Sequence, residues 1–76
     1  MPRSVKVLAN DSGKPAVVTR NGKSYQVVAI LNTWRIDDEW WRKEISRNYF
    51  QVELKNGTVM TVFHDLITGK WYEQRC

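Results

Sequence analysis

The chain has 76 residues, a formal net charge of +4 and one cysteine, Cys76. This length suffices for one small domain and excludes a second, and a single cysteine excludes a disulfide-rich secreted scaffold. The longest apolar run, residues 27–31, is far below the roughly 20 residues that span a bilayer, and no apolar segment of a signal peptide follows the first residues. We therefore expect residues 1–76 to form a single cytoplasmic domain that contacts no membrane.

The positive charge is unevenly distributed. Its whole excess lies in residues 1–32, whereas basic and acidic side chains balance in residues 33–76. A basic domain is compatible with nucleic-acid contact, but the same charge also serves solubility.

The first third of the chain predicts strands. Val5 and Val7 alternate with polar residues, and the turn-forming residues 10–13 end that strand. Asn21-Gly22 predicts a hairpin with a type I′ turn, because both central residues of that turn need positive φ. A two-residue turn places Val18 opposite Tyr25. In the next strand it places four residues on one side: Tyr25, Val27, Ala29 and Leu31.

Residues 33–46 fit two interpretations. Ile36, Trp40, Trp41 and Ile45 could mark one or two helical turns that begin at Asp37 or Asp38, or the segment could be an irregular crossover. Adjacent tryptophans are poor helix formers, so we favour the irregular connection.

Asn56-Gly57 predicts a second hairpin between residues 49–55 and 58–64. A two-residue turn sets Leu54 opposite Val59 and Phe50 opposite Phe63. The buried face is then Phe50, Val52, Leu54, Val59 and Phe63. The other face is Tyr49, Gln51, Glu53, Lys55, Thr58, Met60, Val62 and His64.

Residues 71–74 predict a closing strand after Thr68-Gly69. The fold class is therefore all-β: a small antiparallel sheet, or an SH3-like or OB-like barrel, of five to six strands with two Asn-Gly hairpins. Closure of a barrel, or dimerisation through a sheet edge, would remove exposed edges.

Catalytic patterns are weak. His64-Asp65 could suggest a general base, but no nucleophile accompanies it, and we expect a solvent-facing histidine before a turn that begins at Asp65. One histidine and one cysteine cannot form a structural zinc site. The acids Asp37, Asp38 and Glu39 could bind a hard cation with Glu44. A structural role is favoured, either as charge at a helix N-terminus or as ion pairing with Arg35, Arg42 and Lys43. We predict no enzyme activity, no cofactor and no metal.

Tryptophan is the unusual feature, with four in 76 residues. A small core cannot bury four rings of up to about 250 Å² each, so we expect two in the core and at least one exposed beside arginine. We expect one of the adjacent pair Trp40 and Trp41 near the surface with Tyr49. Rings interleaved with cations suit single-stranded nucleic acid, because bases stack on the rings and cations contact phosphates. The candidate binding residues are Arg35, Trp40, Trp41, Arg42, Lys43, Arg47 and Tyr49.

Several stretches follow a known pattern: residues 34–42 (Trp-Arg-Ile-Asp-Asp-Glu-Trp-Trp-Arg), residues 45–54, Asn56-Gly57, residues 62–66 and residues 69–72. Together they resemble a family of short bacterial proteins with a domain of unknown function, over about residues 25–74. Relatives are often encoded near error-prone, lesion-bypass DNA polymerases, so the resemblance implies a link to DNA damage tolerance. It supplies no catalytic residues.

The leading hypothesis is a non-catalytic accessory domain that contacts single-stranded nucleic acid, or an enzyme acting on nucleic acid such as a DNA polymerase, in bacterial DNA repair. The alternative is a protein–protein interaction module or a homodimer without nucleic-acid contact.

Overall fold

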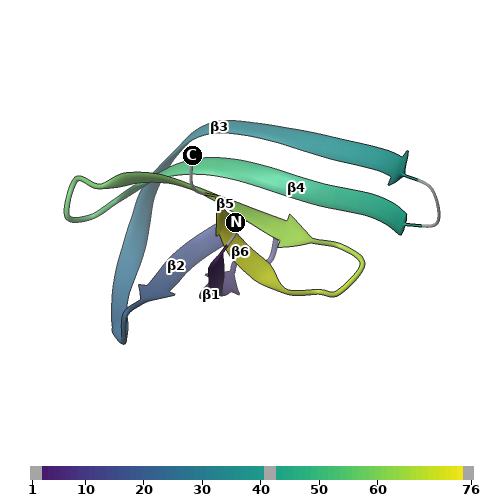
Figure 1. The fold of residues 1–76 in the computed structure, drawn as a ribbon. Helices are drawn as coiled ribbons and strands as arrows, with labels where there is room; N and C mark the ends of the chain where they lie inside the picture. The colour runs from purple at the N-terminus through teal and green to yellow at the C-terminus, as the bar shows by residue number, and fades with distance from the viewer. Residues whose placement is uncertain (1–2, 41–42, 75–76) are drawn as a thin grey trace.

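The structure, a computed structural model, describes residues 3–40 and 43–74. They form a closed antiparallel barrel in which six strands follow one another in sequence order and β6 closes onto β1 (Figure 1). The strands are β1 (Arg3–Ala9), β2 (Pro15–Arg20), β3 (Lys23–Trp40), β4 (Lys43–Leu54), β5 (Val59–Asp65) and β6 (Trp71–Gln74). The all-β fold class is confirmed, with six strands and no helix among the described residues.

No helix capable of crossing a membrane occurs in the described part of the chain.

The first hairpin and the closing strand form as predicted. Asn21 and Gly22 both have positive φ, 52° and 77°, and Val18 pairs with Tyr25. At the earlier turn, the Asn10 side-chain oxygen accepts hydrogen bonds from the backbone N–H groups of Ser12 and Lys14. Local turn chemistry therefore fixes this half of the barrel.

Strand β3 is long because it pairs with one neighbouring strand near its start and with another over the rest of its length. Its first residues pair with β2, and the rest pairs with β4. Register shifts between Val27 and Ala29 and between Ile30 and Asn32 mark the bend, as bulges do. They also interrupt the predicted alternation: Ile30 packs against the core, while Leu31 is exposed. The expectation that Ala29 and Leu31 share a face with Tyr25 is therefore wrong.

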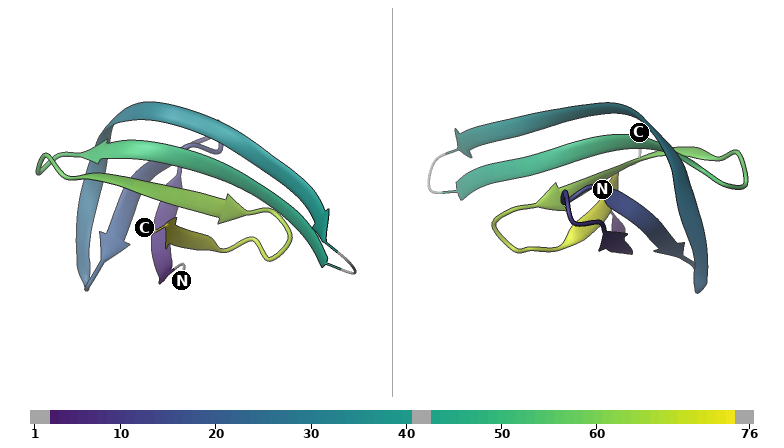
Figure 2. Two further views of the ribbon diagram at one scale, coloured as in Figure 1. Left: turned by 45° about the horizontal axis from the view of Figure 1, so that its top comes forward. Right: turned by 180° about the vertical axis from the view of Figure 1, so that it is seen from behind.

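Residues 33–40 and 43–46 are neither helical nor irregular. They belong to the β3–β4 hairpin, in which Trp34 pairs with Tyr49 and Ile36 with Arg47. The outer part of this hairpin projects past the β5–β6 loop as an arm (Figure 2). Our preference for an irregular crossover was wrong, because residues 34 to 38 alternate in side-chain direction once they pair with a partner strand of matching length.

The second hairpin forms with a register one residue away from the prediction. Gly57 has a φ of 87° and donates to the Leu54 carbonyl, while the Leu54 N–H donates to the Thr58 carbonyl. Asn56 lacks positive φ, so the loop has three residues and Gly57 provides its left-handed position. As a result, Phe50 pairs with Val62.

This shift exchanges the faces of β5, because a one-residue slip reverses every side chain. Met60 and Val62 enter the core, whereas Val59 is exposed. Phe63 is buried, but it packs against Tyr49 on the other face of the sheet. The predicted buried face was therefore right for β4 and wrong for β5.

The barrel interior is a compact apolar core. Its buried members are Val18, Phe50, Val52, Leu54, Met60, Val62 and Trp71. An ion pair, Arg20 to Glu73 at 3.3 Å, joins β2 to β6. Because Glu73 is buried, its charge needs this partner.

Candidate functional site

A row of four aromatic rings crosses the outer face of the sheet. Trp34 on β3 stacks on Tyr49 on β4, with ring centroids 5.3 Å apart. Tyr49 contacts Phe63 on β5 at 4.9 Å, and Phe63 stacks on Tyr72 on β6 at 5.2 Å. The rings belong to directly opposed residues on adjacent strands. We call Trp34, Tyr49, Phe63 and Tyr72 the aromatic ladder.

Arg47 covers the middle of the aromatic ladder. Its guanidinium carbon lies 4.7 Å from the centroid of the Phe63 ring, and its Nη1 donates to the Tyr49 hydroxyl at 3.2 Å. Phe63 is only 1% exposed, although it lies outside the barrel core. Arg47 therefore covers the Phe63 ring from the solvent side, in a geometry typical of cation–π contacts.

The ladder ends on an unpaired strand edge. Beyond Gln26, β3 pairs only with β4 among the described residues, so its other edge lacks a neighbouring strand. Trp34, the last ring, is 40% exposed, and Ile36 on the same face is 41% exposed. An exposed apolar edge of this kind is a template for strand pairing.

Two side chains limit the length of this open edge. The oxygen of Asn32 accepts from the Thr33 N–H at 3.0 Å, and that of Asp38 accepts from the Glu39 N–H at 2.8 Å. Backbone groups alternate in direction along a strand, so the main-chain groups of Arg35 and Asp37 face the same edge. We call residues 33–39 of β3 the open edge.

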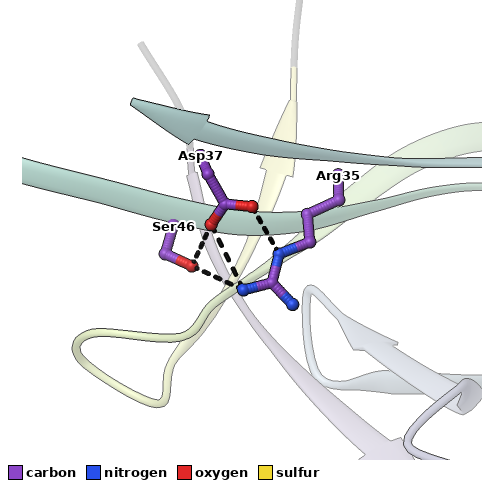
Figure 3. A network of polar contacts seen from close by, with 3 residues as sticks. All are labelled: Arg35, Asp37 and Ser46. Carbon is purple, nitrogen blue, oxygen red and sulfur yellow. Dashed lines mark hydrogen bonds and ion pairs between the residues drawn. The ribbon is translucent and has the colours of Figure 1, made fainter. Parts of the chain in front are cut away.

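Arg35 and Asp37 are joined on the face opposite the aromatic ladder (Figure 3). Arg35 Nε donates to Asp37 Oδ2 at 2.7 Å, and Ser46 Oγ on β4 donates to Asp37 Oδ1 at 2.8 Å. The hydrogen bonds from Arg35 and from Ser46 lower the pKa of the Asp37 carboxyl below its ordinary value. This network holds β3 against β4 in the projecting arm.

The outer part of the arm is acidic among the described side chains. A shallow hollow of about 500 Å³ is lined by Asp37, Asp38, Glu39, Glu44 and Ile45. Arg35 already neutralises Asp37, so the remaining charges among the described side chains of this hollow are the carboxylates of Asp38, Glu39 and Glu44. No group of metal-ligating residues occurs among the residues that the structure describes, and the predicted ion pairing of Asp37 with Arg35 is confirmed.

The sequence-predicted binding residues divide into two sets. Arg35, Arg47 and Tyr49 are described, and each is held by another side chain. Trp40 is the last residue of β3, Lys43 is the first residue of β4, and the two pair with each other. Their side chains lie outside the described part of the chain, and so do Trp41 and Arg42 as whole residues.

Tyr49 corrects one expectation. We expected it near the surface, but it is 6% exposed because its ring contacts Trp34 and Phe63. Of the two tryptophans whose side chains are described, Trp34 is exposed and Trp71 is buried, which confirms that the core does not hide every tryptophan. The prediction that Trp40 or Trp41 lies near the surface falls outside the described side chains. The alternation Trp34-x-Ile36 opposite Arg47-x-Tyr49 was the sequence signal that would have identified it.

His64 also differs from the prediction. It is partly buried rather than solvent-facing, and its ring stacks on Trp71 with centroids 4.4 Å apart. Asp65 begins the turn as expected, since its carboxylate accepts from the N–H groups of Ile67 and Thr68. The histidine therefore packs against the edge of the core.

Comparison with protein-family models, with curated proteins and with solved structures found no match to this chain.

Proposed function

We propose that this domain is a non-catalytic binding module that takes an extended segment of a partner protein as an added strand along the open edge of β3. One observation carries the proposal: within the described part of the chain, β3 beyond Gln26 has a sheet neighbour on one side only, and its exposed apolar residues there include Leu31, Trp34 and Ile36. In strand addition, main-chain hydrogen bonds supply affinity and alternate side chains supply specificity.

The described charges near the open edge favour a protein over single-stranded nucleic acid. A nucleic-acid surface needs cations beside the stacking ring. Arg35 is bound by Asp37, and Arg47 lies over Phe63. The carboxylates of Asp38 and Glu39, on the same strand as Trp34, would repel phosphates. The resemblance to proteins encoded near lesion-bypass polymerases suggests an enzyme of that class as the source of the segment.

The test is binding of a simple strand-forming peptide. The probe is dye-labelled Lys-Thr-Val-Thr-Val-Thr-Lys, measured by fluorescence anisotropy against the full chain. The same peptide with N-methyl groups on alternate amides is the control, because it cannot donate hydrogen bonds from one edge. We expect binding of the unmodified peptide and at least ten-fold weaker binding of the methylated one.

Variants locate the binding surface. Ile36→Lys, on the open edge, should abolish binding, whereas Val59→Lys should not, because Val59 is similarly exposed but lies on β5, outside the open edge. Equal binding of both peptides, or equal loss in both variants, would contradict the proposal.

Two further outcomes would point to other functions. A dimer that light scattering detects in the wild type but not in Ile36→Lys would assign the edge to self-association. Tight binding of a twelve-nucleotide oligo-dT, with log affinity falling by about 0.7 per neutralised phosphate with log salt, would restore the nucleic-acid hypothesis if Ile36→Lys left it unchanged.

A further inference from the structure

We infer that the segment bound at the open edge carries an aromatic residue opposite Trp34 and basic residues opposite Asp38 and Glu39. This inference rests on the proposed strand addition and specifies the chemistry of the segment.

The aromatic preference follows from the geometry of the ladder. Each of its rings is carried by the residue directly opposite the previous one on the next strand, with centroid separations of 4.9–5.3 Å. Trp34 has a ring neighbour, Tyr49, on its β4 side, and beyond it lies the strand edge. An added strand would place one residue directly opposite Trp34 on the same face. An aromatic ring there would continue the row, because opposed rings on adjacent strands stabilise each other.

The basic preference follows from the charges further along β3. Asp38 lies on the ladder face, four residues beyond Trp34, and Glu39 follows on the other face. The nearer acid, Asp37, is already paired with Arg35. Lysine or arginine opposite Asp38 and Glu39 would face exposed carboxylates that form no ion pair with any described side chain, whereas acidic residues there would be repelled.

A second copy of this chain fits the edge less well. An antiparallel two-fold pairing centred on Ile36 would set Trp34 opposite Asp38, so a carboxylate rather than a ring would end the ladder. A pairing centred on Arg35 would set two guanidinium groups opposite each other. Parallel in-register pairing would oppose each acid to itself. A pairing centred on Trp34 would oppose two indoles but would leave Asp38 and Glu39 outside the paired residues. A partner strand of different sequence therefore meets both preferences better.

The experiment compares two peptides of identical composition. Lys-Lys-Thr-Val-Thr-Trp-Thr, bound antiparallel, sets its two lysines opposite Glu39 and Asp38, valine opposite Ile36 and tryptophan opposite Trp34. Lys-Lys-Thr-Val-Trp-Thr-Thr moves the tryptophan to the other face of the strand, where Arg35 lies. Each peptide is titrated by fluorescence anisotropy against the wild-type chain and against Trp34→Leu, which keeps an apolar side chain but removes the ring.

We expect the first peptide to bind the wild type about five-fold more tightly than the second, and Trp34→Leu to bind both equally. A third peptide with glutamates in place of the lysines should bind about five-fold more weakly than the first, with the difference shrinking at high salt.

Equal binding of the first two peptides to the wild type would overturn the aromatic inference and leave strand addition standing. A preference that persists in Trp34→Leu would overturn it as well. No effect of the glutamates would overturn the charge inference. Absence of binding by all three peptides at millimolar concentration would overturn the proposed function itself.

Discussion

Trp34 and Tyr49 face each other across β3 and β4 with their ring planes 7° from parallel and their centroids 5.3 Å apart. They differ sharply in exposure, since Trp34 lies at the open edge and Tyr49 lies inside the row. This pair therefore links the packing of the sheet to the surface that we propose for binding.

Replacement of Trp34 by alanine should lower the free energy of unfolding by only about 1–2 kcal/mol, because the Trp34 ring is partly exposed and stacks on a single ring, that of Tyr49. Urea denaturation measures this cost. Leu8→Ala is the control: Leu8 is an exposed apolar residue on β1 and should cost less than about 0.5 kcal/mol. A cost above 4 kcal/mol for Trp34→Ala would show that Trp34 is primarily structural.

Phe63 tests whether the outer face forms a second apolar cluster. We expect Phe63→Leu and Phe50→Leu to destabilise the protein by similar amounts, roughly 1–2 kcal/mol each, since both rings are buried on opposite faces of the sheet. Chemical denaturation of the two variants provides the comparison. A loss below about 0.5 kcal/mol for Phe63→Leu alone would mean that the ladder adds little stability.

Asp37 should contribute to the pH dependence of stability. Its pKa is lower in the folded chain than the ordinary value of 3.8, because Arg35 and Ser46 donate hydrogen bonds to the carboxylate. Its contribution is therefore complete above about pH 4 and is lost as the pH falls through the folded pKa. Asp37→Asn should be less stable than the wild type at neutral pH and should lose less stability on acidification.

Urea denaturation at several pH values, with Asp11→Asn as a control for the change in net charge, measures the Asp37 effect. Parallel pH profiles for Asp37→Asn and the wild type would contradict the network shown in Figure 3.

Gly57 determines the register of the second hairpin. Its φ of 87° is rare for residues with a Cβ, so Gly57→Ala should cost about 1 kcal/mol or more. Gly57→Asn should cost less, because asparagine tolerates this conformation better. Thermal denaturation would rank the three proteins, and equal stability would contradict the left-handed conformation of Gly57.

The sequence predicted the strands whose signals are local. Asn21-Gly22 predicted one hairpin, alternating apolar residues predicted the part of β4 from Tyr49 onward, and the turn at Thr68-Gly69 placed β6 after it. The prediction assigned the side chains of β5 to the wrong faces of the sheet, since Asn56-Gly57 suits both a two-residue and a three-residue loop. The two loops differ by one residue, which is enough to reverse a strand.

The candidate site was harder to predict because it depends on pairing between distant residues. Arg35, Asp37 and Ser46 form a network only after β3 and β4 pair, and aspartates disfavour strands when read alone. The adjacent tryptophans at positions 40 and 41 are also a more conspicuous sequence feature than the single Trp34. The residues around Trp34 in the sequence do not show that it lies at a sheet edge, because an edge is defined by the absence of a neighbouring strand.

Amide hydrogen exchange at the open edge tests the central claim most directly. With Lys-Lys-Thr-Val-Thr-Trp-Thr bound, the backbone N–H groups of Arg35 and Asp37 should gain protection, because they would donate to the added strand. The N–H groups of β1, which already pairs with β2 and β6, should not change. Binding that leaves the Arg35 and Asp37 amides as exchangeable as in the unbound chain would contradict strand addition at β3.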